Sequence, residues 1–387
     1  MNAVIGTLTD ADMRALGAEL SEEGNPPAAW THDELSAAGA TLAARRGGFV
    51  VASGGTTGDP KIITLAPDLG VPRVLASWQP FDVGDVVLNL FPPGRLWGAH
   101  YFYNAVATHS GALAVPLGAL GPHDLPDWID VIRGLGVTAL AGAPNVLAGF
   151  ADAMRHEGVR LGVRSIVWSG EPLTEGHLQR LAQAFPEAGL WGNYGSIETF
   201  VIGISRAACR RGVLHLLPEQ RLELDDGGAR LTRRGGGWPV PAWRFRLGDR
   251  LARARCSCGD ADGFEVLGRA DDAFKLYGGR VRTGDLLRNA TAIHGVVSAQ
   301  AVLYRDPEVP AAITGLVVRC TGSRPASEVR AELVRSLQDL AICDRHTPGA
   351  IQVQMVDQLD VHPRTLKVRP VVWREAAELD EIEGAST

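Results

Sequence analysis

The sequence contains very little lysine. Of its 38 Lys and Arg residues only three are lysines, Lys61, Lys275 and Lys367, and the other 35 are arginines. A bias toward arginine, such as a high-GC coding sequence produces, removes lysines that a guanidinium can replace. A lysine that remains is therefore a candidate for a role that needs a compact ammonium. The alternative is chance survival at an exposed position.

Long apolar runs and an excess of basic charge are also absent. No segment approaches the roughly 20 apolar residues that cross a bilayer. The N-terminus carries Asp10, Asp12 and Glu19 and has no basic segment ahead of an apolar run, so we expect that it is not a signal peptide. The formal net charge of -6 gives no bulk attraction to nucleic acid or an anionic membrane. Five cysteines, an odd number, argue against a secreted disulfide framework. We expect a cytoplasmic protein that binds neither nucleic acid nor membranes.

Strand-like and helix-like patterns alternate between residues 48 and 200. We expect strands at 48–52, 85–91, 137–143 and 165–170, and helices at 144–158, 173–185 and after a capping Thr31. This alternation predicts an α/β fold in which helices cover a parallel sheet.

The pattern changes after residue 200. Short strands bounded by Gly, Pro or Asp are expected at 212–217, 221–226 and 229–234, and they predict a small, mostly antiparallel β region. Farther on, strands at 298–306, 314–320 and 350–356 and a helix at 326–340 predict a compact α+β unit. We therefore expect a large domain at 1–268 and a small C-terminal domain at 269–387.

A glycine-rich loop, SGGTTGDPK at 53–61, directly follows the first of these strands. Its glycines let backbone N–H groups approach a polyphosphate, its threonines donate further hydrogen bonds, and its lysine adds charge. The spacing GxxxxGK[ST] is absent, so the loop is not a Walker A motif. Taken alone, such a loop can also be an ordinary surface turn.

Five more motifs follow this loop. They are SGEPLT (169–174), NYGSIE (193–198), RFRLGDR (244–250), LGRADDAFKLYGGRV (267–281) and HPRTLKVRP (362–370). In this order and spacing, the motifs resemble the ANL superfamily of acyl-CoA synthetases, peptide-synthetase adenylation domains and luciferases, and most closely its phenylacetate-CoA ligase-like branch. The resemblance covers about residues 48–370. It implies an adenylating enzyme that uses ATP and Mg²⁺ and has a mobile C-terminal lid domain.

The resemblance also implies roles for individual residues. Tyr194 would lie against adenine, Asp249 would accept hydrogen bonds from the ribose hydroxyls, and Glu198 would bind Mg²⁺ through a hard carboxylate oxygen. The phosphate-binding residues would be Ser53, Thr56, Thr57, Gly58 and Lys61. Further ATP-binding positions would be Gly170, Glu171, Asn193, Gly195, Ser196, Arg269 and Lys275.

Lys367 matches the family lysine that reaches the carboxylate and the α-phosphate, and Asp271 matches the family hinge. A carboxylate that attacks a phosphate brings two anions together. A cation that arrives only for this step stabilises the transition state selectively. The resemblance therefore makes Lys367 and Glu198 the catalytic residues.

The sequence departs from the family pattern at three places. Ile197 replaces a hydroxyl residue that contacts the α-phosphate, and Ser196 or Thr199 is expected to substitute for it. Leu366 replaces the glycine before the catalytic lysine. The region before the phosphate loop is short, so we expect an N-terminal subdomain to be missing or reduced, with a second subunit of a homodimer covering the interface. The first two departures keep open a non-catalytic relative that binds nucleotide or acts as a scaffold.

Aromatic residues mark the expected acyl pocket. Trp97, His100, Tyr101, Phe102 and Trp168 match or adjoin family segments that line this pocket, and they favour an aromatic or apolar acid. His100 can equally be a satisfied structural histidine. The acceptor of the acyl group is either CoA or a carrier-protein phosphopantetheine, or, in an amide ligase, an amine. The arginine bias is also compatible with bacterial secondary metabolism.

Four further residues form a metal-ligand set. Cys256 and Cys258 belong to a CxCG motif, and Cys209 and His215 lie about 45 residues earlier. Three thiolates and one imidazole complete a tetrahedral site for structural Zn²⁺. Buried free cysteines are the alternative.

Overall fold

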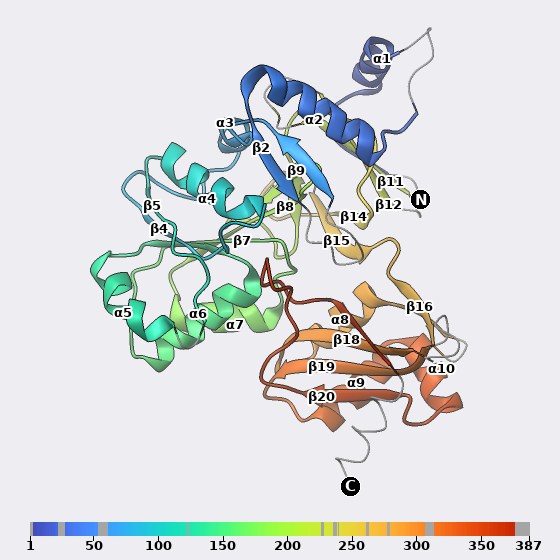
Figure 1. Ribbon diagram of the computed structural model, residues 1–387. Coiled ribbons are helices and arrows are strands. Elements are labelled where there is room, and N and C mark those ends of the chain that lie inside the picture. The colour runs from blue at the N-terminus through green and yellow to red at the C-terminus, as the bar shows by residue number, and fades with distance from the viewer. Residues whose placement is uncertain are drawn as a thin grey trace. The chain divides into compact units, whose positions relative to one another are not determined.

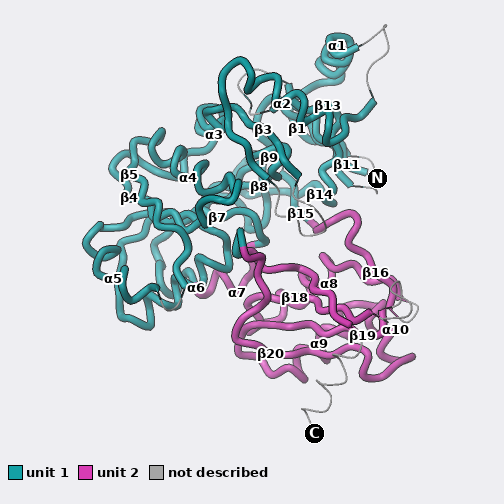
Figure 2. The backbone as a smooth tube through the Cα atoms, in the orientation of Figure 1, with its two compact units in different colours: residues 1–172, 181–266, 364–366 teal, residues 173–180, 267–363, 367–387 magenta. Residues whose placement is uncertain are grey.

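The computed structural model describes residues 3–21, 28–52, 61–121, 124–225, 228–234, 238, 240–260, 263–276, 279–305 and 313–375. The chain forms two compact units, which Figure 2 distinguishes by colour. The first unit comprises 1–172, 181–266 and 364–366, and the second comprises 173–180, 267–363 and 367–387. The chain passes from the first to the second unit after Pro172, after Val266 and after Leu366, and the longest continuous part of the second unit follows Val266.

A nine-stranded sheet with the order β14-β15-β10-β9-β8-β7-β6-β4-β5 forms the centre of the first unit (Figure 1). Its parallel part comprises β4 (Val86–Asn89), β5 (Leu113–Val115), β6 (Ala139–Gly142), β7 (Ser165–Ser169) and β8 (Gly189–Ser196). Its antiparallel part adds β9 (Phe200–Ser205), β10 (Leu214–Leu216), β14 (Asp249–Ala254) and β15 (Gly263–Arg269). β6 has four buried residues, as expected for a parallel strand covered on both faces.

Helices cover both faces of the parallel part. α4 (Gly98–His109) lies on one face, and α5 (Leu125–Gly134) and α6 (Pro144–His156) lie on the other (Figure 1). Phe102 and Val106 of α4 pack into the same core as Val87 and Val167 of the sheet. The remaining helices that begin before residue 200 are α1 (Asp10–Glu19), α2 (His32–Arg46), α3 (Val71–Leu75) and α7 (Glu175–Ala184).

Two smaller sheets complete the first unit. One has the order β1-β11-β12-β13, with β1 (Ala3–Gly6), β11 (Gln220–Asp225), β12 (Gly228–Arg233) and β13 (Ala242–Arg246). The other pairs β2 (Phe49–Ala52) with β3 (Ile62–Leu65), the strands that flank the phosphate-loop sequence. α2 packs beside β3 and begins with a capping box, in which Thr31 and Glu34 satisfy each other's backbone N–H groups.

The second unit is an α+β structure. Its main sheet has the order β20-β19-β18-β21, with β18 (Val296–Arg305), β19 (Ile313–Gly322), β20 (Ile351–Met355) and β21 (Val371–Glu375). β16 (Ala273–Leu276) pairs with β17 (Gly279–Arg282), and the helices are α8 (Thr283–Ala292), α9 (Ala326–Ser336) and α10 (Gln338–His346). Apolar residues of α8, α9 and the sheet form its own core.

These elements confirm the α/β fold class predicted from the sequence and the N-cap at Thr31. Two details of the prediction were wrong. The segment expected to be one helix at 326–340 is broken at Leu337, whose φ of -125° and ψ of 114° are extended. The strand expected at 212–217 forms β10 of the large sheet rather than part of the small one. Among the described residues, no helix combines the length and hydrophobicity that a membrane span requires.

Candidate functional site

The hairpin formed by β8 and β9 carries the NYGSIE motif. β8 follows β7 in the parallel part of the sheet and then reverses into β9, so the motif begins where a parallel strand ends. Gly195 is required at this hairpin, because a Cβ atom there would lie 1.8 Å from the carbonyl oxygen of Phe200. In open α/β sheets, ligands bind beyond the carboxyl ends of the parallel strands.

Tyr194 and Asp249 are brought together although they lie in different motifs. The Tyr194 hydroxyl donates a hydrogen bond of 2.6 Å to Oδ2 of Asp249, which begins β14. The Tyr194 ring also packs edge-to-face against the Phe264 ring, with 5.8 Å between the ring centroids. A half-buried aromatic ring beside a carboxylate provides a stacking surface and a hydroxyl acceptor, the two features that recognise a nucleoside.

Asn193 is fixed by a buried network. Its Nδ2 donates to the Tyr103 hydroxyl at 2.7 Å, and its Oδ1 accepts from the Ser169 hydroxyl at 2.7 Å. Burial raises the pKa of Tyr103, so this phenol stays protonated. Sequence reasoning missed Tyr103, whose only signal was its place in a segment selected for its aromatic residues.

The turn between β8 and β9 contains Glu198. The hydroxyls of Ser196 and Thr199 are 3.0 Å apart, and the Thr199 N–H donates to Ser196 Oγ at 3.2 Å. Thr199 is fully buried, and half-buried Ile197 packs against the apolar core. The two hydroxyls proposed to replace that of a residue at 197 therefore bond to each other.

The SGEPLT motif lies at the end of β7. Gly170 has a φ of 87°, a left-handed conformation that glycine adopts without strain. Oε2 of Glu171 accepts a hydrogen bond of 3.3 Å from the N–H of Asn145, in the first turn of α6. A carboxylate at this position compensates the unpaired N–H groups of the helix.

The phosphate-loop residues Ser53, Thr56, Thr57 and Gly58 lie outside the described residues, whereas Lys61 is described and exposed. Before the loop, the Ala52 N–H donates to the carbonyl of Leu96 at 2.9 Å. Gly94, Arg95 and Leu96 have φ values of 76°, 49° and 60°, so two non-glycine residues are left-handed there. Such backbone strain persists only where the surrounding structure enforces it.

Residues expected to bind ATP also occur in the second unit. There Arg269 Nε donates to Asp271 Oδ1 at 3.2 Å, and Lys275 is exposed on β16. Lys367 is half-buried and belongs to a short hairpin, in which its carbonyl accepts from the His362 N–H at 2.8 Å. Leu366, where the family resemblance leads us to expect glycine, has a φ of 54°.

Arg364, at the tip of that hairpin, is grouped with the first unit. Its Nη1 donates to the carbonyls of Arg95 at 2.8 Å and Ala52 at 3.2 Å. Its guanidinium carbon lies 5.9 Å from the Trp97 ring centroid. Arg364 therefore contacts the backbone directly before the phosphate-loop sequence.

The residues proposed for the acyl pocket have different surroundings. Phe102 is 2% exposed and packs edge-on against Phe200, and Trp97 is also buried. A ring nitrogen of buried His100 lies 2.6 Å from the carbonyl of Phe91, whereas Tyr101 is 41% exposed.

Trp168 depends on a glycine that sequence reasoning missed. A Cβ atom at Gly192 would lie 2.4 Å from the Trp168 ring, so glycine is what allows the ring its position. Trp168 itself is 9% exposed. The only sequence signal was the glycine at this place in β8.

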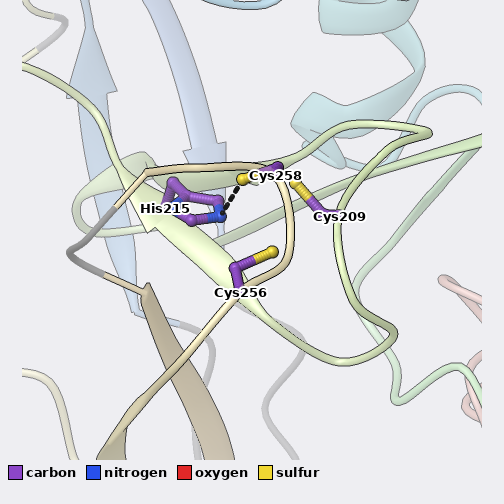
Figure 3. A group of neighbouring side chains, drawn as sticks. All are labelled: Cys209, His215, Cys256 and Cys258. Atoms are coloured by element: carbon purple, nitrogen blue, oxygen red, sulfur yellow. Dashed lines mark hydrogen bonds between the residues drawn. The ribbon is translucent and has the colours of Figure 1, made fainter.

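Cys209, His215, Cys256 and Cys258 form a cluster in the first unit (Figure 3). Their ligand atoms all lie within 4.8 Å of one another, and Cys258 Sγ is 3.3 Å from His215 Nε2. Cys209 precedes β10, His215 lies on it, and the two other cysteines lie between β14 and β15. The sequence thus correctly grouped residues from distant segments.

The environment of this cluster suits metal-bound thiolates. The N–H groups of Arg206 and Arg210 donate to the sulfurs of Cys209 at 3.3 Å and Cys256 at 3.1 Å. Buried His215 has Nδ1 4.0 Å from an Asp260 oxygen, so a carboxylate lies behind the imidazole, as in many zinc sites.

Two thiols of the cluster have shifted pKa values. Burial raises the pKa of Cys209 to about 11. Burial also acts to raise the pKa of Cys256, but hydrogen bonds from Cys258, His215 and Arg210 outweigh it and lower that pKa to about 6. A divalent cation would replace the remaining thiol protons, which is how zinc binding and cysteine ionisation are linked.

Comparisons with known proteins bear on the family and the fold of the chain. The family model described as "AMP-binding enzyme" matches residues 5–259. Indoleacetate–lysine synthetase of Pseudomonas savastanoi is 25% identical over 202 residues, which are 52% of this chain and 50% of that protein. One of the plipastatin synthase subunits of Bacillus subtilis is 25% identical over 375 residues, 86% of this chain and 14% of that protein. The chain thus spans half or less of the length of these two relatives.

Solved structures share the fold. A 2-hydroxyisobutyryl-CoA ligase bound to its acyl-AMP has a TM-score of 0.60 at 15% identity, covering 97% of this chain and 81% of that one. An anthranilate CoA ligase bound to anthranoyl-AMP has a TM-score of 0.59 at 16% identity, covering 87% and 66%. These likenesses establish the fold alone, and the phenylacetate-CoA ligase-like branch stays a prediction. Because the family model matches most of the sequence, the chain belongs to the AMP-binding enzyme family.

Proposed function

We propose that this protein is an ATP-dependent adenylating enzyme that joins a carboxylic acid to AMP and passes the acyl group to a thiol of CoA or of a carrier-protein pantetheine. The observation that carries the proposal is the hydrogen bond of 2.6 Å between Tyr194 and Asp249, which places an aromatic ring and a carboxylate together beside the Glu198 turn. In this reading the ring stacks on adenine and Asp249 binds the ribose hydroxyls. The name of the relative indoleacetate–lysine synthetase supports an aromatic acid.

The proposed chemistry follows from charge. One oxygen of the substrate carboxylate forms a bond to the α-phosphorus, and the bond to the β-phosphate breaks, so pyrophosphate leaves with the electron pair. Ser53, Thr56, Thr57, Gly58 and Lys61 would hold the leaving phosphates. Glu198 would bind the Mg²⁺ that neutralises them, since a carboxylate oxygen suits this cation. Lys367 would supply positive charge where the two anions meet.

A pyrophosphate exchange assay tests the first half-reaction. The enzyme, supplied with ATP, Mg²⁺ and a panel of carboxylic acids, is expected to exchange labelled pyrophosphate into ATP with at least one acid, and aromatic acids should be the best. No exchange with any acid would favour a non-catalytic relative.

An amine acceptor is the second candidate, because indoleacetate–lysine synthetase is among the relatives. Release of AMP in the presence of CoA, a phosphopantetheinylated carrier protein or lysine separates the two candidates. We expect stimulation by a thiol, and stimulation by lysine alone would identify an amide ligase.

We also propose that the cluster of three cysteines and His215 holds one structural zinc ion. The donor set is complete for tetrahedral zinc, and the ligand atoms lie close enough to share one ion. The cluster joins the segment before β10 to the turn before β15. A metal there would fix two connections of the large sheet.

Asp271 is the proposed hinge between the two half-reactions, and its replacement by proline is expected to affect them unequally. The chain passes into the second unit after Val266, a few residues before Asp271. Proline fixes φ near −65°, so it would favour one arrangement over the other. The measurement compares pyrophosphate exchange with acyl transfer from pre-made adenylate. Equal losses in both assays would argue against alternation at this residue.

A further inference from the structure

Arg233, the last residue of β12, is a buried cation. Its side chain is 1% exposed, and Nε donates to Oε1 of Gln220 at 2.9 Å. Nη2 donates to the carbonyl of Val201 at 2.7 Å, and Nη1 donates to that of Thr199. Within the part of the chain that the structure describes, its hydrogen-bond partners include no carboxylate. Burying an unpaired charge is unfavourable, so the carbonyl contacts are what this guanidinium is placed to make.

The two carbonyls flank a strained residue. Phe200, between Thr199 and Val201, has a φ of 59°, a left-handed conformation that is unfavourable for a side chain of this size. The planar guanidinium presents two parallel N–H groups at a fixed spacing. It therefore holds one carbonyl on each side of the strained peptide and stabilises a conformation that the local sequence disfavours.

Gln220 extends this arrangement. It accepts from Arg233, while its Nε2 donates to the carbonyl of Ile202 at 2.8 Å and to that of Leu217 at 3.2 Å. The Trp238 ring covers the guanidinium, with 4.6 Å between its carbon and the ring centroid. Side chains from the small sheet therefore fix the first residues of β9.

The fixed backbone continues directly into the turn that carries Glu198. The hydrogen bonds between Ser196 and Thr199, which lie before and after Glu198, also hold this turn. A shift of the Thr199 peptide would therefore move the Glu198 backbone and its carboxylate.

We propose that Arg233 is a positioning residue for Glu198. By holding the carbonyls of Thr199 and Val201, it keeps the Glu198 carboxylate where it binds the Mg²⁺ that accompanies ATP. This inference rests on the proposed function, because only an adenylating enzyme gives Glu198 that task. Arg233 itself touches neither the metal nor the substrate.

The test compares Arg233→Lys with the wild type in pyrophosphate exchange while the Mg²⁺ concentration is varied. A lysine keeps a charge but cannot bridge two carbonyls, and loss of a group that orients a metal ligand typically weakens metal binding ~10–100-fold. We expect the Mg²⁺ concentration for half-maximal rate to rise about 10-fold, with the KM of the acid unchanged. An unchanged Mg²⁺ requirement would overturn the proposal.

Arg230→Met is the matched control, since Arg230 lies on the same strand but forms an ion pair with Asp225. It should leave the Mg²⁺ requirement at the wild-type value, and a shift as large as that of Arg233→Lys would overturn the proposal. Gln220→Leu provides a second variant, which removes the acceptor of Arg233 Nε together with the hydrogen bonds from Gln220 to the carbonyls of Ile202 and Leu217. It should raise the Mg²⁺ concentration for half-maximal rate, but by less than Arg233→Lys does. An unchanged concentration would contradict a role of this hydrogen-bond network.

A double-mutant cycle separates positioning from general destabilisation. In a Glu198→Ala background, the Arg233→Lys substitution should cause no further fall in the rate of pyrophosphate exchange. The effects of two substitutions that act on one metal contact are non-additive. Fully additive losses would overturn the proposal.

Hydrogen exchange separates this proposal from the proposed function. Absence of any wild-type adenylation would refute the proposed function. The effect of Arg233 on the turn could still be measured by amide hydrogen exchange. Amides at 196–201 should exchange faster in Arg233→Lys than in the wild type, without nucleotide. Unchanged exchange there would overturn the positioning role whatever the activity.

Discussion

Lys367→Ala is expected to reduce acyl-adenylate formation by ~10²-fold or more, the loss typical of a missing transition-state charge. The same variant, supplied with pre-made acyl-adenylate, should transfer the acyl group at close to the wild-type rate. The hairpin hydrogen bond from the His362 N–H to the carbonyl of Lys367 is made by the backbone, so it is compatible with the truncation. Single-turnover measurements of each half-reaction provide the comparison.

Lys367→Arg should also be impaired, because a wide planar head is a poor substitute for an ammonium. Arg369→Ala, which removes an exposed cation from the same segment, serves as the control and should adenylate normally. Near-normal adenylation by Lys367→Ala would show that this lysine has lost its family role. Lys275 or Arg364 would then be the cation to test.

Cys258→Ser is expected to reduce the metal content of the purified protein from about one zinc per chain to well below half. It should also lower Tm by roughly 5–10 °C, the shift that loss of about 3 kcal/mol produces in a domain of this size. The reason is that the proposed ion would join two connections of the large sheet. Elemental analysis and thermal unfolding provide the measurements.

Cys343→Ala distinguishes metal loss from loss of packing. Cys343 is fully buried in the second unit, and its thiol contacts the carbonyl of Leu276 at 2.8 Å. This variant should be less stable but keep its zinc. A wild-type protein that is fully stable without metal would contradict the zinc site.

The fold could be predicted where local signals agree with packing. The N-cap was expected at Thr31 from the sequence, and the structure has it there, in a capping box with Glu34. Alternating apolar strands and helices likewise predicted the parallel sheet. The break at Leu337 could not be predicted, because apolar residues continue across it and only the packing of α9 and α10 produces it. The sheet that β10 joins is likewise decided by long-range pairing with β9 and β15.

The candidate site was predictable only for residues inside recognisable motifs. Tyr194 and Asp249 were identified in this way, and the structure brings them into contact. Tyr103, Gly192 and Arg233 support the motif residues from outside, and each acts through its position in three dimensions. One arginine among the 35 of this chain carries no sequence signal of being buried.

Leu366 has a consequence for the freedom of the chain around Lys367. A leucine in the left-handed conformation raises the energy of the folded hairpin by about 1–2 kcal/mol relative to a right-handed one. A glycine at this position would cause no such strain. Glycine, however, would give the unfolded segment many more backbone conformations to lose. The leucine therefore narrows the range of shapes that the lysine-bearing segment samples whenever it leaves its hairpin. Compared with the glycine that the family resemblance leads us to expect, leucine restricts the backbone of the segment that carries the proposed catalytic cation.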